Sequence, residues 1–420
     1  MIIKYKLNNG MTVLLEPIDS VVSISAGLWV KVGSRDEEES RQGYAHFIEH
    51  MLFKGTEKYS AKDIARVVDR VGGQHNAATN REYTCYYINV ISDYLELAVE
   101  LLADMYHNSL FDPVEMDKEK NVILEEIRMY EDTPDELVHD IFMECMLSDH
   151  PLGHSILGNL ETINGISKEK LIDFFSDYYL DNNCIFVIAG KFTESHARQL
   201  VDNYFALDGK GGVFQEDRKK MQHNRIFHRH IDRNLEQVHF CLGTDGLTKK
   251  DDDRWTLFAL STILGGSMSS RLFQNIREKE GLCYSIYSFH SSYTDKGIFG
   301  IYCGTSPDNY RKALDLILQE CHDLLDRGII EEELEDAKAF MKGNLALSLE
   351  STEVRMGQLA RTEMAFGRYF SFEEIVEQVD QISLSDFRRV TERVFQSQKL
   401  TLVSIGKLEE SDAHLTEIQL

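Results

Sequence analysis

The chain has 420 residues, of which 70 are acidic and 45 are basic, and its formal net charge at neutral pH is -25. This length fits roughly two to four domains, and the 43% of hydrophobic residues can fill more than one buried core. The acidic balance argues against nucleic acid as a partner, because binding to polyphosphate depends on cationic side chains. Basic peptides and metal ions are the partners that such a charge favours.

Cysteine usage and hydropathy predict a cytoplasmic protein without a membrane span. The 7 cysteines are scattered and form no C-x-x-C pair, which favours buried free thiols over disulfides or a thiolate zinc site. The first fifteen residues have neither the uninterrupted apolar core nor the cleavage site of a signal peptide. The longest apolar runs, such as 184–190, are far shorter than the ~20 residues that a membrane span needs.

The first clear element is a strand, followed by a short motif on a predicted helix. Apolar residues at every second position over 24–32 are typical of a half-buried strand. The motif contains His46 and His50, and residues four apart lie on one helix face, about 6 Å apart along the axis. Both imidazoles can therefore reach one metal ion, and Glu49 lies beside them.

This H-x-x-E-H pattern is that of an inverted zincin. Zinc binds neutral imidazole nitrogens and leaves an open position for a water molecule. A carboxylate at position 49 can take a proton from that water and give it to a leaving amine. On these five residues alone, a surface helix with solvated histidines is the alternative, and a metal site needs a third ligand.

The next predicted helices cover 94–105 and 115–132, and the second of them is acidic. Glu119 and Glu126 are two turns apart and share one face of this helix. The spacing does not choose between Glu125 and Glu126 as a third ligand. An ordinary acidic helix surface remains an alternative for the whole segment.

Two segments repeat one pattern at a constant offset of 216 residues. Residues 166–192 and 382–408 align without gaps, and each consists of a predicted helix, a short turn, an apolar strand and Gly-Lys. Two copies of one α+β unit are the favoured interpretation, and two unrelated helix–strand units are the alternative. The polar stretch between the copies predicts a boundary, with domains at 1–208 and 233–420 and a linker at 209–232.

In the second half, two strands are predicted over 284–289 and 297–304, followed by helices over 310–324 and 334–349. The fold class expected for the chain is therefore α+β. Each of the two homologous domains is expected to contain a mostly antiparallel or mixed sheet with helices packed on one face.

Four motifs, in order along the chain, resemble the pitrilysin, insulysin and mitochondrial processing peptidase family of inverted zincins. They are HFIEHMLFKGT (46–56), GGQHNAATNREYTCYY (72–87), EKNVILEEIRMYEDTPDELVHD (119–140) and GGSMSSRLFQNIREKEGLCYSIYS (265–288). The similarity covers essentially the whole chain, and the length resembles the short, two-domain, bacterial-type processing proteases. The resemblance implies a zinc metalloendopeptidase that hydrolyses peptides or unfolded polypeptide segments inside a clamshell chamber.

The resemblance also implies roles for single residues in the first half. His46, His50 and Glu126 match the ligands of one Zn2+ per chain, and Glu49 matches the general base. Glu119 matches a supporting acid that orients a histidine.

Two further pairs of residues match positions that bind substrate in the family. Asn76 and Ala77 match a strand segment whose backbone pairs with an extended substrate. Arg277 and Tyr284 match a pair that faces the scissile peptide. Tyr284 can donate a hydrogen bond to the oxyanion, and Arg277 can bind a substrate carbonyl.

The second half has no H-x-x-E-H motif. The resemblance therefore implies a catalytic first domain and a second domain that contributes substrate-binding residues. The implied partners are peptide substrates, with basic ones favoured by the charge, and a second copy of the chain in a homodimer. In such a dimer, Arg277 and Tyr284 are expected to act on the other subunit. The alternative is a non-catalytic scaffold, which is disfavoured because all the matched site residues are present.

Overall fold

The structure, a computed structural model, describes residues 2–206, 225–396, 400–414 and 418. Most of the predicted linker, 209–232, lies outside these residues, although its last five residues form a strand, His228–Asp232. The chain divides into two compact units. The first unit contains Met1–Met129, His154–Lys219 and Ser348–Tyr369, and the second contains Tyr130–Gly153, Lys220–Leu347 and Phe370–Leu420.

The first unit is built on a six-stranded mixed sheet. Its strands, in the order in which they lie in the sheet, are β1 (Ile3–Lys6), β2 (Thr12–Pro17), β6 (Cys184–Gly190), β3 (Ser23–Val30), β5 (Thr84–Ile91) and β4 (Gln74–Thr79). Its helices are α1 (Tyr44–Leu52), α2 (Ala61–Asp69), α3 (Leu95–Asn108), α4 (Pro113–Glu131), α6 (Leu160–Asn164), α7 (Lys168–Tyr178), α8 (Glu194–Phe205) and α12 (Thr352–Phe366). Among the described strands of this sheet, only β2 and β6 run parallel to each other.

The second unit is built on a five-stranded mixed sheet. Its strands, in sheet order, are β7 (His228–Asp232), β11 (Thr401–Gly406), β8 (Val238–Asp245), β10 (Gly297–Thr305) and β9 (Cys283–Ser292). Its helices are α5 (Pro134–Met146), α9 (Arg254–Gly265), a π-helical segment (Phe273–Lys279), α10 (Tyr310–Arg327), α11 (Glu331–Ser348), α13 (Phe372–Asp380), α14 (Leu384–Val394) and α15 (Glu410–Ala413).

The repeat predicted from the sequence has the same structure in both copies. The pair α7–β6 and the pair α14–β11 begin with equivalent serines, Ser167 and Ser383, which accept hydrogen bonds from the backbone N–H three residues later. Both strands end at a glycine with positive φ, 133° at Gly190 and 140° at Gly406. A side chain at either glycine would clash with backbone atoms of the neighbouring strand or the residue before it. The predicted α+β fold is therefore confirmed.

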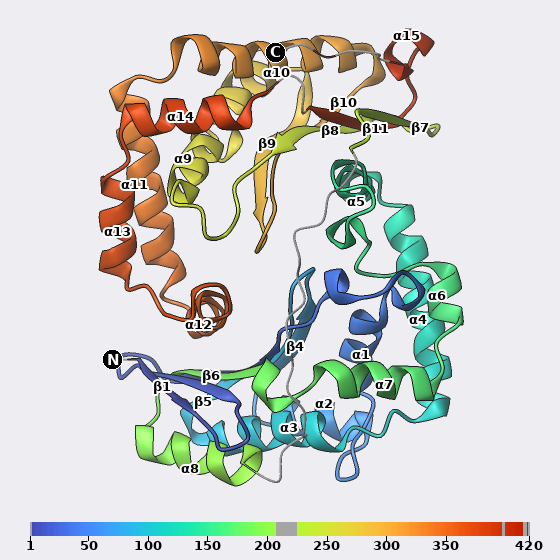
Figure 1. Ribbon diagram of the computed structural model, residues 1–420, viewed down its shortest axis with the longest axis vertical. Coiled ribbons are helices and arrows are strands. Elements are labelled where there is room, and N and C mark those ends of the chain that lie inside the picture. Colours follow the sequence, from blue (N-terminus) through green and yellow to red (C-terminus); the bar gives the residue numbers. More distant parts are fainter. Residues whose placement is uncertain (1, 207–224, 397–399, 415–417, 419–420) are drawn as a thin grey trace. The chain divides into compact units, whose positions relative to one another are not determined.

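Each sheet is covered on both faces, and the second face is covered by a helix that is distant in sequence (Figure 1). In the first unit, α12 packs through Met356, Leu359 and Ala360 on one face of the sheet, opposite the main core formed with α1, α3, α7 and α8. In the second unit, α5 covers the corresponding face of β8 and β11. The two sheets therefore receive equivalent covering helices, each from the half of the chain that supplies the other sheet.

This cover corrects the expectation of a half-buried strand over 24–32. Residues Ile24–Val30 of β3 are buried on both faces, because α12 occupies the side that was expected to face solvent. Ser25, a polar residue of the strand pattern, is fully buried and its hydroxyl lies 2.9 Å from the hydroxyl of Thr352 at the start of α12. This hydrogen bond satisfies a polar group that would otherwise be buried without a partner.

Two other sequence predictions concern the cysteines and membrane spans. All the cysteines are free, and they are buried except Cys283, which is partly exposed. In the part of the chain that the structure describes, none of the helices has both the length and the apolar character needed to cross a membrane. The cytoplasmic location stays a prediction.

Candidate metal centre

Helix α1 is mostly buried and has one polar side. Most of its residues belong to the main core of the first unit, which leaves His46, Glu49 and His50 as its polar side. The helix starts after Gly43, and the buried carboxylate of Glu37 accepts hydrogen bonds from the backbone N–H groups of Gly43 and Ala45, at 2.8 and 2.7 Å. An acidic group at this position satisfies free N–H groups at the helix start and complements the helix dipole.

The two imidazoles of α1 converge with a carboxylate of α4. The Nε2 atoms of His46 and His50 lie 3.2 Å apart. Each lies 3.8 Å from a carboxylate oxygen of Glu126. Around a tetrahedral zinc ion with bonds of about 2.0–2.1 Å, neighbouring ligand atoms lie about 3.3 Å apart. The three side chains therefore fit zinc in both chemistry and spacing. Within the described residues, they form the one group of three or more metal-ligating side chains with this convergence.

The structure separates the two glutamates that the sequence left as alternatives. The side chain of Glu125 is 72% exposed and pairs with Arg128 on the same helix. Glu126 points to His46 and His50 instead. Because consecutive helical residues lie about 100° apart around the axis, only one of the two can reach the histidines.

A buried acid fixes the orientation of His50. Glu119, only 4% exposed, accepts a hydrogen bond from Nδ1 of His50 at 2.7 Å. With its proton on Nδ1, the ring directs the lone pair of Nε2 toward His46 and Glu126. Burial acts to lower the pKa of His50, but the hydrogen bond to Glu119 and the nearby carboxylates raise it overall. The pKa of Glu119 is lowered, since its bonds to His50 and Lys54 outweigh its burial.

His46 is held in the neutral form that binds metals. Burial, reinforced by the nearby charge of His50, lowers its pKa to about 3. Its Nδ1 atom is buried and has no hydrogen-bond partner within the structure. A neutral imidazole whose Nε2 faces two other ligand atoms is ready to bind a metal without first losing a proton.

Glu49 lies next to the ligands and is held from the other side by strand β4. The hydroxyl of Thr79, at the end of β4, donates a hydrogen bond to Oε2 of Glu49. Burial raises the pKa of Glu49, and the contacts with Thr79 partly oppose this effect. A carboxylate with a raised pKa beside a metal site is suited to accept a proton and to return it.

A hollow of about 260 Å3 opens beside these groups. Its lining residues come from α1, the turn after it, β4 and α4: Glu49, His50, Phe53, Lys54, His75, Asn76, Ala77 and Glu119. Strand β4 is an edge strand of the sheet, so one side of its backbone is open to a further strand. The ring of His75 contacts Phe53, with centroids 5.3 Å apart, and His75 lies outside the group of metal-type ligands.

Arg277 and Tyr284 belong to the second unit and contact each other. The guanidinium of Arg277 lies over the ring of Tyr284, 5.1 Å from its centroid. The pairing of β9 with β10 shifts at this point, so that Cys283 and Ser285 have partners in β10 and Tyr284 is the extra residue. Such a bulge re-aims a side chain, and Tyr284 is 78% exposed.

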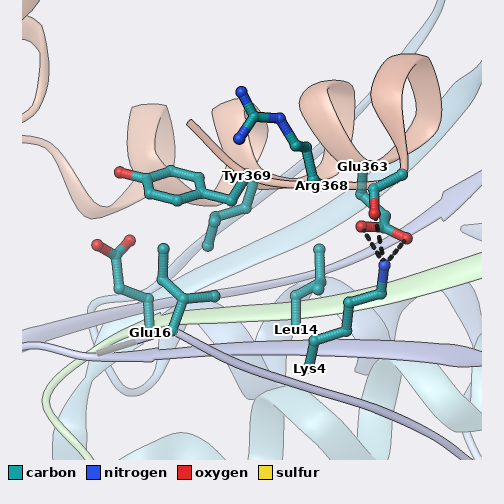
Figure 2. Close-up of a pocket in the computed structure, with 9 residues that line it drawn as sticks. Lys4, Leu14, Glu16, Glu363, Arg368 and Tyr369 are labelled. Carbon is teal, nitrogen blue, oxygen red and sulfur yellow. Dashed lines mark hydrogen bonds and ion pairs between the residues drawn. The ribbon is translucent and has the colours of Figure 1, made fainter. Parts of the chain in front are cut away.

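A larger hollow of about 580 Å3 lies elsewhere in the first unit, between β1, β2 and the end of α12 (Figure 2). It lacks the convergence of donor atoms seen at the metal centre. Lys4 pairs with Glu363 at 2.6 Å, and Glu16 pairs with Arg355 at 2.6 Å. Its acidic groups are therefore already engaged by cationic side chains.

Two contacts of the metal centre were not expected from the sequence, those of Thr79 and Lys54. Lys54 reaches Oε2 of Glu119 at 2.6 Å. Both residues lie inside the quoted motifs, but a single threonine at a strand end and a single lysine after a helix carry no spacing signal. In the second unit, His230 bonds the hydroxyl of Ser404 at 2.9 Å, and neither His228 nor His230 joins a group of metal-type ligands among the described residues.

Known proteins resemble the chain over almost all of its length. The family profile described as insulinase (peptidase family M16) matches residues 12–160, and that described as peptidase M16 inactive domain matches residues 165–341. An uncharacterised zinc protease of Bacillus subtilis is 38% identical over 96% of this chain and 98% of the relative. An uncharacterised zinc protease of Streptomyces coelicolor is 35% identical over 97% of this chain and 90% of the relative.

Solved structures share the fold. A protease from Helicobacter pylori superposes with a TM-score of 0.87 at 24% identity, covering 97% of this chain and 99% of the other. A structure described as a peptidase M16 inactive domain, from Pseudomonas fluorescens, gives a TM-score of 0.89 at 21% identity and covers both chains completely. At these identities, the likeness supports the fold alone.

Proposed function

Because the chain belongs to the insulinase family, peptidase family M16, we propose that it is a zinc-dependent endopeptidase acting on peptides or unfolded polypeptide segments. The observation that carries this proposal is the convergence of His46, His50 and Glu126, with Glu49 at their side. The family assignment supports a zinc protease in general, and the roles of single residues rest on the geometry of the first unit.

One zinc ion per chain is held by His46, His50 and Glu126. When bound, zinc polarises the scissile carbonyl and lowers the pKa of a water molecule at its open position. Burial keeps His46 neutral, and the hydrogen bond to Glu119 fixes the tautomer of His50 so that its Nε2 faces the other ligands. Glu119 therefore acts on His50 rather than as a ligand.

Glu49 moves the proton. Thr79 holds the carboxylate through a hydrogen bond to Oε2, and the carboxylate accepts a proton from the attacking water. After attack, the protonated carboxyl gives the proton to the leaving amine. The raised pKa of Glu49 suits both steps, because a stronger base takes the proton more readily and a weak acid still returns it to an amine.

The substrate binds as an extended strand along β4. Asn76 and Ala77 lie on this edge strand and line the hollow beside Glu49. Pairing through backbone hydrogen bonds orients a peptide without requiring a particular sequence, and the hollow takes one of its side chains. The net charge of -25 favours basic peptides as substrates.

Arg277 and Tyr284 complete the site in a homodimer, in which they act on the zinc site of the other subunit. In this proposal a second copy closes the chamber. Tyr284 donates to the oxyanion, and Arg277 binds a carbonyl of the substrate. The contact between the two side chains and the exposure of Tyr284 support this role. A mixture of Glu49→Gln and Tyr284→Phe chains tests it: verified heterodimers recover activity if the pair acts in trans, and remain inactive if it does not.

Zinc analysis combined with peptide cleavage tests the proposed function. The purified full chain is expected to contain zinc, to cleave a diverse peptide library, to lose cleavage with a chelator and to regain it with zinc. A chain without zinc that cleaves no peptide, even after zinc is added, contradicts the proposal and favours a non-catalytic scaffold. Cleavage that persists in a zinc-free chain contradicts it as well.

A further inference from the structure

We propose that Lys54 is a positioning residue of the metal centre: its ammonium fixes Glu119, and Glu119 in turn fixes His50. This inference rests on the proposed zinc site. It is carried by a continuous chain of contacts, from Nζ of Lys54 to Oε2 of Glu119 at 2.6 Å and from Oε1 of Glu119 to Nδ1 of His50 at 2.7 Å.

The last turn of α1 places Lys54 beside Glu119. The backbone N–H groups of Phe53 and Lys54 bond the carbonyls of His50 and Met51, at 3.2 and 3.0 Å, which closes the helix with a tight last turn. The side chain of Lys54 then lines the same hollow as His50 and Glu119. It remains 28% exposed, whereas the side chain of Glu119 is 5% exposed.

Glu119 needs contacts to both of its oxygens in order to act as a fixed support. A carboxylate that is held at one oxygen can still rotate about its last bond, and the ring that it supports can rotate with it. Lys54 and His50 hold the two oxygens separately, so the plane of the carboxylate is fixed. A buried carboxylate without a cationic partner would also be costly, and Lys54 supplies that partner.

Two effects of Lys54 on zinc affinity have opposite signs. Its positive charge repels a dication, so removing the charge alone would strengthen zinc binding. Its support of His50 strengthens binding, and loss of such an outer partner typically weakens metal affinity by about 10–100-fold. The proposal therefore requires that support outweighs repulsion, and the direction of the change on mutation separates the two effects.

The test measures zinc affinity directly, by competition with a chromophoric chelator, on the full chain stripped of metal. Lys54→Met is expected to weaken zinc binding by about 10-fold, and Lys54→Arg to retain most of it. Lys118→Met is the matched control, because Lys118 lies on α4, is exposed and pairs with Glu115 at 2.6 Å. It is expected to leave the affinity unchanged. Unchanged or tighter binding by Lys54→Met overturns the proposal.

A double-mutant cycle with Glu119→Gln tests whether Lys54 acts through the glutamate. In the Glu119→Gln background, Lys54→Met is expected to cause no further loss of affinity, whereas an equal further loss overturns the proposal. The double variant also removes both members of the ion pair, so it provides a folded reference if Lys54→Met alone is unstable. If the unaltered chain binds no zinc, both this inference and the proposed function fail. If it binds zinc and Lys54→Met binds equally well, only the inference fails.

Discussion

The corner between α1 and β4 in the first unit corresponds to the corner between α9 and β9 in the second. The two sheets have the same strand order apart from β1, which has no counterpart in the second sheet. In the first unit, the corner opens into the hollow that contains Glu49 and His50. In the second unit, the hydroxyls of Ser261 on α9 and Ser288 on β9 lie 3.1 Å apart, and Ser288 also donates to the carbonyl of Ser261 at 2.7 Å.

The second corner is closed because Gly265 lets the backbones approach. A Cβ atom at Gly265 would lie 2.3 Å from the backbone nitrogen of Ser288. In the first unit, α1 presents Glu49 and His50 to the hollow beside the edge strand, whereas in the second unit α9 presents Ser261 to Ser288. In the first unit, polar side chains line a hollow between the helix and the edge strand, whereas in the second unit the helix and the edge strand pack closely.

The largest expected effect comes from replacing Glu49, the proposed general base in the corner between α1 and β4. Glu49→Gln is expected to lower kcat for peptide cleavage by about 10^2–10^4-fold, because the amide cannot accept the proton. Zinc content should be unchanged, since Glu49 is not one of the three converging ligands. Ser261→Ala in the second corner is the matched control, with cleavage close to that of the unaltered chain. If Glu49→Gln and Ser261→Ala lowered kcat by similar factors, the two corners would not differ in their role in cleavage.

The next effect concerns the ligands. His50→Ala removes one of three protein ligands and is expected to weaken zinc binding roughly 100-fold or more, because a site of several ligands shares a large binding free energy. Chelator competition and metal analysis measure the loss. His230→Ala in the second unit should have no effect, as its ring bonds Ser404 instead. If His230→Ala lost zinc and His50→Ala kept it, the metal would lie in the second unit, which would contradict the assignment of the site.

Gly265→Ala tests the closed corner. The added methyl group meets backbone rather than a flexible side chain, so the variant is expected to lose about 1–3 kcal/mol of unfolding free energy. Urea unfolding measures this loss, and the zinc affinity of the folded protein should not change. Unaltered stability would mean that the close approach of α9 and β9 does not exist in solution.

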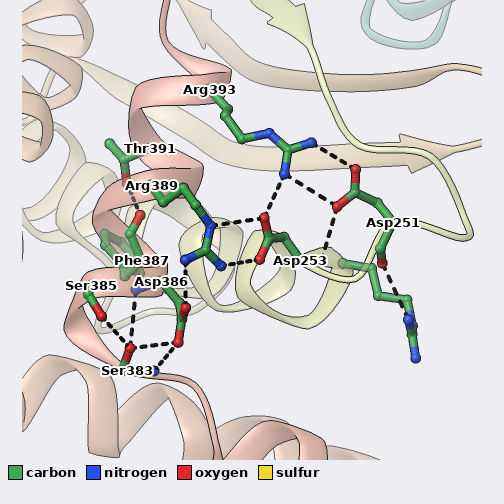
Figure 3. Close-up of polar contacts among 10 residues, drawn as sticks. Asp251, Asp253, Ser383, Ser385, Asp386, Phe387, Arg389, Thr391 and Arg393 are labelled. Carbon is green, nitrogen blue, oxygen red and sulfur yellow. Dashed lines mark hydrogen bonds and ion pairs between the residues drawn. The ribbon is translucent and has the colours of Figure 1, made fainter.

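The smallest expected effect concerns the side-chain contacts that hold α1 in the first unit and α9 in the second. In the first unit, α1 meets α7 through the rings of Tyr44 and Phe174, 5.8 Å apart. In the second, Arg389 and Arg393 of α14 pair with Asp251 and Asp253 before α9 (Figure 3).

Asp251→Asn breaks one of these ion pairs. Burial would raise the pKa of Asp251, but its hydrogen bond from Arg393 lowers it below the ordinary value of 3.8. A depressed folded pKa stabilises the fold above that value, and the stabilisation is lost as pH falls through the folded pKa. The variant should therefore lose less than about 1 kcal/mol at pH 7 because the pair is partly exposed. Urea unfolding should show the difference shrinking as the pH falls below about 4. A difference that grows on acidification would contradict this account.

Much of the fold could be predicted because the two copies repeat local signals. The caps at Ser167 and Ser383 and the positive-φ glycines at 190 and 406 are spaced identically, and each is read from nearby residues. It could not be predicted that α12 covers the sheet of the first unit and α5 the sheet of the second. An amphipathic pattern identifies the buried face of a helix such as α12, but it does not say which sheet covers that face.

For the candidate metal centre as well, local sequence patterns do not give the contacts between elements that are distant in sequence. Spacing brings His46 and His50 to one helix face, because both lie on a single regular element. It does not decide between Glu125 and Glu126, since that choice depends on how α4 is rotated against α1. Lys54 carries no sequence signal at all, because its contact with Glu119 joins residues that are 65 positions apart.

The most direct test of the central claim is diffraction from crystals of the full chain grown with zinc, with data collected on both sides of the zinc absorption edge. We expect an anomalous peak within bonding distance of Nε2 of His46, Nε2 of His50 and the carboxylate of Glu126, and loss of that peak in His50→Ala. A peak only elsewhere, or one that persists in His50→Ala, would contradict the assignment of the metal centre to the first unit.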